Sequence, residues 1–365
     1  AGPTGDLPAS CNPLRQNEAC LLPFPSAIFL DVDSSTKTGF RVQLAKEMFP
    51  RSTMGKTYDP VRMNRADGFS PTGEILAYFP ERLDPASLPA FGDLDASRAP
   101  GSATVIVDME SGERVAHLSE VDAQVFADSD RQTLILRPAA RLTGGRRYAV
   151  AVTKSARTLT GEVPAAPPGW EAILTQTASD PLAKKQAARM PAIIEWLAGA
   201  GVAKDQLVLA WDFVVQSDDS LTHAMRAMRS TTLAMLKDGP LGYTITSTED
   251  DFNTRTLRRI RGTFKTPKFL SQTDVKVAEA TLTFDEAGAP VVDGTYDAPF
   301  TLILPRAATT GPVKLLLFGH GFLGTGEGEL GGAEGSYLQD LADEKGYAII
   351  ATDWVGLSRY EGYDS

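Results

Sequence analysis

Short apolar runs separated by turn-forming residues recur along the middle of the chain and predict β-strands. Three of them, Thr104–Asp108, residues 132–137 and Arg147–Thr153, either alternate apolar with polar positions or are apolar throughout. The segments between them are rich in glycine, serine and aspartate, which favour turns. Because the runs follow one another at regular spacing, the pattern predicts a small all-β sandwich of immunoglobulin-like type.

A helical pattern follows. Asp180 and Pro181 form an N-cap and first-turn signal, and apolar residues then recur at helical spacing. Pro191 is expected to kink or split this helix. Residues 206–215 read as a buried strand, and a second helix is expected from Ser217, with its methionine-rich stripe in the core.

From about residue 244 the strand pattern returns, in runs at residues 258–264, 280–284, 300–304 and 313–318. A glycine-rich turn, an amphipathic helix over residues 334–345 and an apolar strand over residues 347–353 come next. The order strand, helix, strand indicates a βαβ unit, so a parallel sheet is expected to begin here.

The fold class expected from these patterns is multidomain, all-β combined with α/β. Residues 1–83 are rich in proline, glycine and polar residues and are expected to form an extended segment. An immunoglobulin-like β-sandwich over residues 84–160, a helical and mixed region over residues 161–240 and an α/β domain over residues 241–365 are expected to follow.

Charge narrows the classes of partner. The chain has 46 acidic and 36 basic residues and a net charge of −10. This excess argues against a nucleic-acid partner, which requires basic clusters. The basic run at residues 255–261 is interpreted as a solvated strand edge. No apolar run approaches the length of about 20 residues that a membrane-spanning helix needs.

The two cysteines indicate the compartment. Cys11 and Cys20 bracket a short polar segment without histidines, so a zinc site is not indicated. A disulfide between them is expected, and the alternative is two unrelated free thiols. Because disulfides persist in oxidising environments, we expect a secreted, periplasmic or outer-surface protein.

Residues 315–332, LLLFGHGFLGTGEGELGG, contain the sequence GHGFLG, which fits the dinucleotide-binding pattern G-x-G-x-x-G. That mechanism requires a helix to begin directly at the third glycine. Here a helix is expected only near Glu334, and Glu327 and Glu329 would repel a pyrophosphate. A nicotinamide or flavin protein is therefore an alternative that ranks behind the two functions considered below. We expect no cofactor and no metal.

A strand followed by His-Gly-x-x-Gly also suits acyl transfer. The tetrahedral intermediate of that reaction carries a negative oxygen, which preorganised backbone N–H groups stabilise. Glycines let the chain turn back at the strand end, and the residue after the first glycine directs its amide inward. In this sequence that residue is Phe322, within an expected oxyanion loop at residues 319–325.

The stretch VKLLLFGHGFLG resembles the oxyanion-loop strand of α/β-hydrolases, especially bacterial lipases with an HG-x-x-G turn. The resemblance implies that the Phe322 main-chain N–H is one oxyanion donor and that Phe322 and Leu323 border the acyl pocket. It also implies that His320 and Gly321 support the loop and that His320 is not the catalytic base. Asp353, in the stretch DWVG, matches a structural turn of the family.

The wider layout resembles the bacterial virulence-factor lipase family, whose members are exported enzymes with a β-rich N-terminal domain. The stretches LPFPS at residues 22–26 and LVLAWDF at residues 207–213 are similar to that group. The specific hydrolase resemblance covers about the last 60 residues.

The chain lacks the G-x-S-x-G elbow of such enzymes, and neither Ser336 nor Ser358 has the second glycine in place. His117, in an expected sandwich loop, and His223, in a helix, precede the hydrolase region. We therefore expect the N-terminal part of a serine esterase or lipase for lipids or small esters. A C-terminal fragment, released by cleavage after Ser365, would carry the triad. The alternative is a non-catalytic extracellular surface or adhesion module.

Other candidate sites have structural interpretations. Residues 31–35 have oxygen ligands but lack the glycine and distal glutamate of a calcium loop, so a turn is expected. Asp212 is expected to be a structural acid bonded to backbone amides. Glu327, Glu329 and Glu334 are expected to be solvated.

Overall fold

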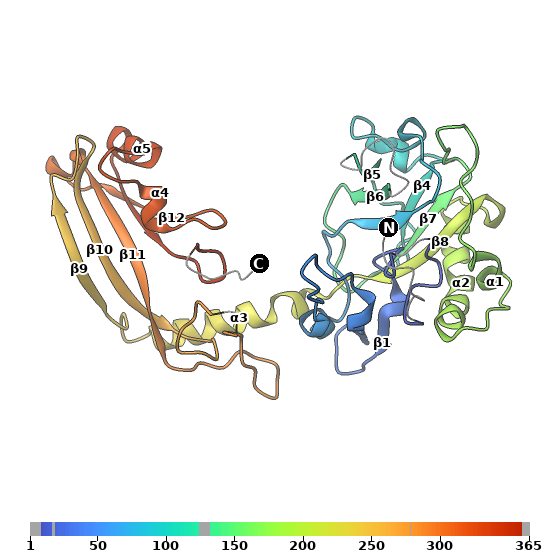
Figure 1. Cartoon of the computed structure of the whole chain (residues 1–365), viewed down its shortest axis with the longest axis horizontal. Helices are drawn as coiled ribbons and strands as arrows, with labels where there is room; N and C mark the ends of the chain where they lie inside the picture. Colours follow the sequence, from blue (N-terminus) through green and yellow to red (C-terminus); the bar gives the residue numbers. More distant parts are fainter. Residues whose placement is uncertain (1–8, 17–18, 124–131, 278, 360–365) are drawn as a thin grey trace. The chain divides into compact units, whose positions relative to one another are not determined.

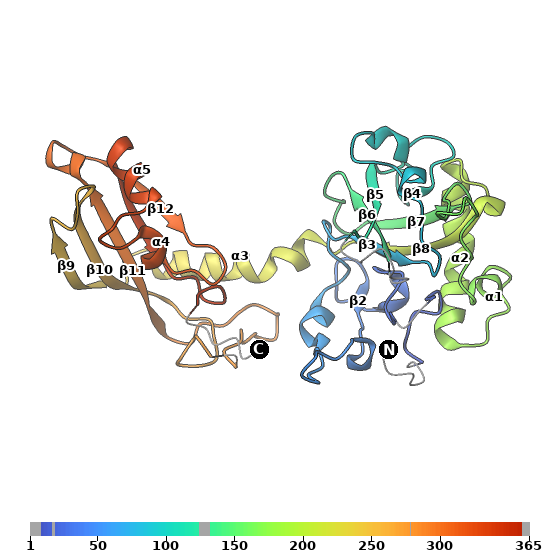
Figure 2. The ribbon, with the colours of Figure 1, turned by 45° about the horizontal axis from the view of Figure 1, so that its top comes forward.

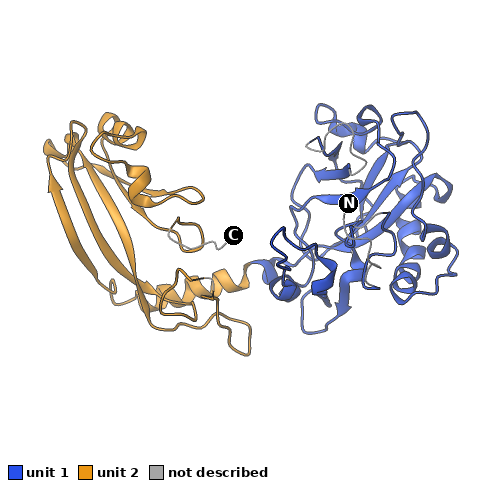
Figure 3. Ribbon diagram, in the orientation of Figure 1, with its two compact units in different colours: residues 1–221 blue, residues 222–365 orange. Residues whose placement is uncertain are grey.

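The protein is seen in a computed structural model that describes residues 9–16, 19–123, 132–277 and 279–359. The chain divides into two compact units, residues 1–221 and residues 222–365 (Figure 3). Strands in several sheets form the centre of each unit, and α-helices are few among the described residues (Figure 1). The β-rich character and the separate sheets predicted from the sequence are confirmed. The end of the chain, where cleavage after Ser365 was expected, lies outside the described residues.

The first unit holds strands β1 to β8 and helices α1 and α2. Its strands are β1 Leu30–Val32, β2 Phe40–Val42, β3 Ile75–Tyr78, β4 Thr104–Asp108, β5 His117–Val121, β6 Thr133–Pro138, β7 Arg147–Thr153 and β8 Leu207–Val214. Its α-helices are α1 Trp170–Leu174 and α2 Pro181–Gly199, and its 3-10 helices are η1 Ala27–Phe29, η2 Lys46–Met48, η3 Pro60–Arg65, η4 Pro85–Ser87, η5 Leu94–Ser97 and η6 Lys204–Gln206. Helix α3, Asp218–Met235, begins here and continues beyond residue 221.

Two three-stranded antiparallel sheets form the centre of the first unit, in the orders β4-β7-β8 and β3-β6-β5. All of β4 and β8 is buried, as is all of β7 except Arg147. One hydrophobic core runs from Cys11 to Val215, so the N-terminal segment, the predicted sandwich strands and the helical region all contribute to it. The two sheets are compatible with a β-sandwich.

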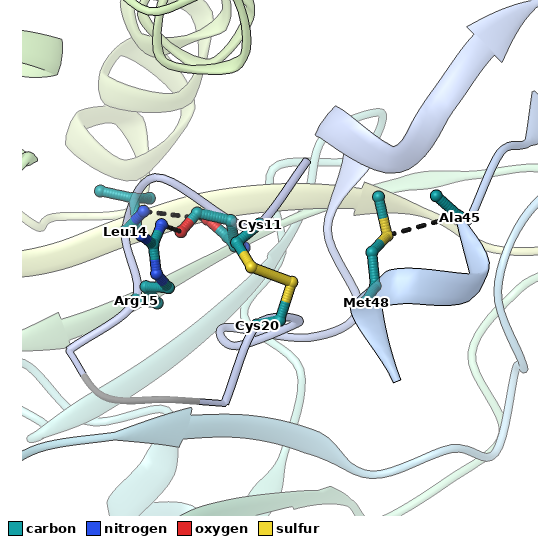
Figure 4. The surroundings of a disulfide bond; sticks show 7 residues. Cys11, Leu14, Arg15, Cys20, Ala45 and Met48 are labelled. Atoms are coloured by element: carbon teal, nitrogen blue, oxygen red, sulfur yellow. Dashed lines mark hydrogen bonds between the residues drawn. A yellow bond between two sulfur atoms is a disulfide. The ribbon is translucent and has the colours of Figure 1, made fainter. Parts of the chain in front are cut away.

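The predicted disulfide between Cys11 and Cys20 is present (Figure 4). Both cysteines are buried, and the Asn12 N–H donates to the Cys20 carbonyl at 2.7 Å within the closed loop. Cys11, Leu14 and Cys20 all belong to the hydrophobic core of the first unit. No free cysteine accompanies the pair.

The first unit corrects two predictions about single residues. Asp180 caps α2 as predicted, accepting from the Leu182 and Ala183 N–H groups at 2.9 and 3.0 Å. Pro191, however, does not split this helix, which continues to Gly199. His117 does not lie in a loop but opens strand β5, where it is fully buried.

The second unit is built on one mixed sheet in the order β12-β13-β11-β10-β9. Its elements are β9 Tyr243–Asp250, β10 Thr256–Pro267, β11 Thr295–Pro305, η7 Arg306–Thr309, β12 Lys314–Gly319, α4 Gly326–Leu330, α5 Tyr337–Lys345 and β13 Tyr347–Thr352. Strands β12 and β13 are parallel, as the predicted βαβ unit requires, and the other pairs are antiparallel. Residues 280–284 do not form the predicted strand; they make only isolated bridges.

Helices α4 and α5 lie on the same face of this sheet in both views (Figures 1 and 2). They cover a core of Ile303, Leu330, Leu338, Ala342, Ile349 and Ala351. Strand β12 lies at the edge of the sheet, and Leu315 and Leu317 on its other face are 67% and 76% exposed.

Helix α3 also departs from the sequence prediction. It begins at Asp218 with Asp218 and Asp219 in its first turn, as predicted, but none of its residues is buried. The methionine-rich stripe is therefore not core, and Met225 is 67% exposed. No helix among the described residues combines the length and apolar character that crossing a bilayer requires.

Candidate oxyanion loop

Strand β12 ends at Gly319, where the chain leaves the sheet. A Cβ atom on Gly319 would lie 2.7 Å from Cζ2 of Trp354, well inside van der Waals contact. The bare α-carbon therefore lets the Trp354 ring lie directly against the end of the strand. Trp354 follows β13, so this contact joins the loops after the two parallel strands.

The next residues form a tight turn. The Gly324 N–H donates to the Gly321 carbonyl at 3.0 Å, and Leu323 has a φ of +60° while Phe322 does not have positive φ. A positive φ at the third residue alone is typical of a type II turn, in which Phe322 is the second residue. Phe322 thus lies in a turn at the strand end and outside any helix.

Hydrogen bonds hold this turn to the segment after β13. The Leu323 N–H donates to the Leu357 carbonyl at 2.8 Å, and the Arg359 N–H donates to the Gly324 carbonyl at 3.3 Å. Leucine at positive φ is strained, and such a conformation persists only where the surroundings impose it. These two bonds supply that constraint.

The ring of His320 holds the turn through two hydrogen bonds to backbone groups. The side chain is buried, Nδ1 lies 2.7 Å from the Gly321 carbonyl oxygen, and Nε2 accepts from the Trp354 N–H at 2.9 Å. The acceptor role of Nε2 assigns the proton to Nδ1, which donates to Gly321. Because both ring nitrogens are bonded to backbone, His320 has the geometry of a positioning residue and not of a general base.

A short helix follows directly, which corrects the prediction that no helix begins before Glu334. Helix α4 begins at Gly326, only two residues after Gly324. Its first turn is closed by this chain's own groups, since Asp353 Oδ1 accepts from the Gly326 N–H and Thr325 Oγ1 accepts from the Gly328 N–H, both at 2.9 Å. Amides that a pyrophosphate would need are thus engaged by a carboxylate and a hydroxyl.

Helix α4 is also fixed to the sheet by charge. Glu327 accepts from Arg261 Nη2 at 2.6 Å, so it is paired and not simply solvated. Arg259 and Arg261 both contact Glu249, and the hydrogen bond from Arg259 lowers the pKa of that carboxyl group.

The basic run lies on β10, between β9 and β11, and the expectation of a strand edge is wrong.

Apolar side chains surround the turn. Phe322 is 70% exposed and Leu323 47% exposed, and Trp354, Val355 and Leu357 on the neighbouring loop are also exposed. The two loops come from the carboxyl ends of adjacent parallel strands. The exposed apolar side chains of the two loops therefore follow the same ends of two adjacent strands.

The other candidates have structural partners elsewhere. Asp212 is fully buried, but it pairs with the guanidinium groups of Arg147 and Arg189 and not with backbone amides, which corrects the prediction. Asp33 accepts from the Ser35 N–H, which closes the predicted turn at residues 31–35. Within the described part of the chain, no group of three or more His, Cys, Asp or Glu side chains is placed to hold a metal.

The sequence motif identified the loop but not the groups that hold it. No sequence motif marked Trp354 or Thr325. The Trp354 N–H bonds to His320, which is 34 residues away, and the Thr325 hydroxyl bonds to the Gly328 N–H, which is 3 residues away. Asp353 was expected to be structural from the DWVG stretch, and its bond to Gly326 supplies the geometry.

Comparison with known proteins adds no family to these observations. No model of a protein family matches the chain, and no curated protein matches its sequence.

Proposed function

We propose that this chain supplies the oxyanion loop of an exported serine carboxylic ester hydrolase, a lipase or esterase of α/β-hydrolase fold. The Phe322 N–H is one oxyanion donor, His320 and Gly321 support the loop, and Phe322 and Leu323 border the acyl pocket. The observation that carries this proposal is the pair of hydrogen bonds that the His320 ring makes, one to the Gly321 carbonyl and one from the Trp354 N–H.

In this reaction a serine hydroxyl adds to the ester carbonyl carbon, and the carbonyl oxygen becomes negative. The Phe322 N–H hydrogen-bonds to that oxygen, and the alcohol then leaves as the acyl-enzyme forms. Water adds to the acyl-enzyme through a second oxyanion and releases the carboxylic acid. A donor that is fixed beforehand needs no reorganisation when the charge develops, which is why the bracing of the turn matters.

The nucleophile, acid and histidine belong to a second polypeptide from the same precursor in this proposal. Support comes from β12, an edge strand with two exposed leucines on the face away from α4 and α5. The strand register pairs Leu317 with Ile350, Ile350 with Leu302 and Leu302 with Ile260. An apolar row therefore crosses four adjacent strands of the sheet. Such a surface is suited to association with another apolar element. The Cys11–Cys20 disulfide supports an oxidising, extracytoplasmic location.

Replacement of Phe322 by proline tests the donor directly. Proline has no N–H, and it suits the second position of a type II turn, so F322P deletes the donor while keeping the turn. In the protein purified with the polypeptide that carries the serine, kcat on p-nitrophenyl esters should fall roughly 100- to 1000-fold.

F322A is the matched control, because it removes the same ring but retains the N–H. It should mainly raise KM. Equal kcat values for F322P and F322A would rule out Phe322 as a donor. If a fluorophosphonate labels no serine in the co-purifying polypeptides, the non-catalytic surface module becomes the better description.

A further inference from the structure

The first unit contains an open cavity of about 500 Å³ that the ester hydrolase proposal does not use. It lies between η3, residues 24–25 and residues 68–70, with Val42 on its floor. The volume falls within the range of about 300–1,000 Å³ typical of small-molecule sites. Every lining residue belongs to residues 1–221, so the cavity is complete within that unit.

The floor of the cavity is apolar and preformed. Phe24 and Phe69 meet edge to face, with ring centroids 5.2 Å apart. The Trp211 indole N–H donates to the Pro25 carbonyl at 2.8 Å and holds that residue in place. The Phe69 N–H donates to the Val214 carbonyl at 2.9 Å, which ties the other wall to strand β8. Such a floor suits a hydrocarbon chain and needs no rearrangement to receive it.

The rim is cationic although the chain is acidic overall. Arg62 is exposed and has no ion-pair partner among the residues that the structure describes. Arg65 is a second guanidinium in the lining. The acid of the lining, Glu74, is paired with Arg137, which also contacts Glu120 at 2.6 Å. The Arg62 guanidinium therefore places a positive charge at the cavity, and it complements an anion.

We propose that this cavity binds a medium-chain fatty acid, with the alkyl chain on the Phe24–Phe69 floor and the carboxylate at Arg62. A guanidinium matches a carboxylate in charge and geometry, and it gives an alkyl carboxylate an advantage over the corresponding alcohol. The cavity shares no residue with the oxyanion loop, and the test of binding does not require ester hydrolysis.

The test is calorimetric titration of the whole protein with sodium decanoate and with decanol, below the concentrations at which either aggregates. Decanoate should bind the native protein about ten-fold more tightly than decanol. R62Q should weaken decanoate binding about ten-fold and leave decanol unchanged, while A66L, which fills the cavity, should abolish both. R51Q, an exposed arginine outside the lining, is the matched control.

Equal affinities of the native protein for decanoate and decanol, or no binding of either, would overturn the proposal without recourse to any variant. Equal loss in R62Q and R51Q would show only a general charge effect and would also overturn it. Undiminished binding to a folded A66L protein, verified by its melting temperature, would place the ligand elsewhere.

Discussion

The side-chain amide of Gln176 donates a 2.6 Å hydrogen bond to the carbonyl oxygen of Ala187. Ala187 lies four residues before Pro191. In a regular helix the N–H of residue 191 would donate to the Ala187 carbonyl, but proline has no N–H. Ala187 is buried, so the unpaired carbonyl would have no water to satisfy it. Gln176 thus explains how α2 passes through a proline without breaking.

A double-mutant cycle tests this relationship. Q176A should destabilise the protein by about 1–2 kcal/mol, because a buried carbonyl loses its donor. P191A restores the backbone N–H, and in that background Q176A should cost less than about 0.5 kcal/mol. Urea unfolding measures both. The φ of +62° at residue 176 is common to both backgrounds, so equal costs of Q176A would contradict the explanation.

Local patterns predicted most elements because the causes of those elements are local. Asp180 capping α2, the buried strand β8 and the strand-turn arrangement at β12 depend on neighbours a few residues away. Pro191 failed as a helix breaker because its compensating donor, Gln176, comes from a preceding turn that no periodicity reveals.

In the candidate site, too, local features could be predicted from the sequence and contacts between distant residues could not. The sequence indicated a turn at Gly321 and Phe322, and the family resemblance implied ring hydrogen bonds for His320, but the ring's partner, the Trp354 N–H, is 34 residues away. The start of α4 was missed because two of its first three residues, Gly326 and Gly328, are glycines, which are weak helix formers. Thr325 and Asp353 supply the caps that make this short helix form.

Removal of the His320 ring should loosen the loop. H320A leaves the Trp354 N–H without its acceptor, so exchange of this amide with deuterium should accelerate roughly 5- to 10-fold, the equivalent of about 1 kcal/mol for one hydrogen bond. The Ile349 amide, in the middle of strand β13, is the internal control. Acceleration of both amides would indicate general unfolding, and an unchanged Trp354 amide would contradict the bracing role.

The ion pairs of Asp212 should be far more sensitive than a surface pair. Asp212 is fully buried and receives a two-point contact from Arg189, so D212N should cost about 3–5 kcal/mol of unfolding free energy. D95N is the matched control, because Asp95 pairs with Arg98 on the surface and should cost less than about 0.5 kcal/mol. Similar costs for the two variants, measured by urea unfolding, would be the contrary result.

His117 should make stability depend on pH. Burial is the main cause that lowers its pKa from 6.5 to about 4, and its Nε2 lies 2.9 Å from the Thr104 hydroxyl, which in turn lies 2.7 Å from the Ser119 hydroxyl. The folded state therefore keeps the ring neutral, while the unfolded chain takes up a proton as pH falls below 6.5. Stability is lost through that window as pH falls towards 4.

Between pH 7 and pH 5 this linkage amounts to about 2 kcal/mol. The unfolding free energy of the native protein should fall by that amount relative to H117Q, which has no titrating ring at this position. Urea unfolding at both pH values gives the difference. Parallel pH profiles for the two proteins would show that His117 does not control the window.

The exposed edge of β12 should matter for association and not for folding. Leu317 is 76% exposed, so L317K should change the unfolding free energy by less than about 0.5 kcal/mol. A lysine there places a charge on the apolar row from Leu317 to Ile260, and such charges block pairing at sheet edges. We therefore expect L317K to lose both the co-purifying polypeptide and its fluorophosphonate labelling.

I245K, on the edge strand at the opposite side of the same sheet, is the control for a lysine on an exposed strand position. It should retain the polypeptide and the labelled serine. If L317K and I245K co-purify with the same partner to the same extent, β12 is not where the second polypeptide joins the sheet. If L317K itself unfolds, the leucine contributes to the core of this unit, and its exposure does not mark an interface.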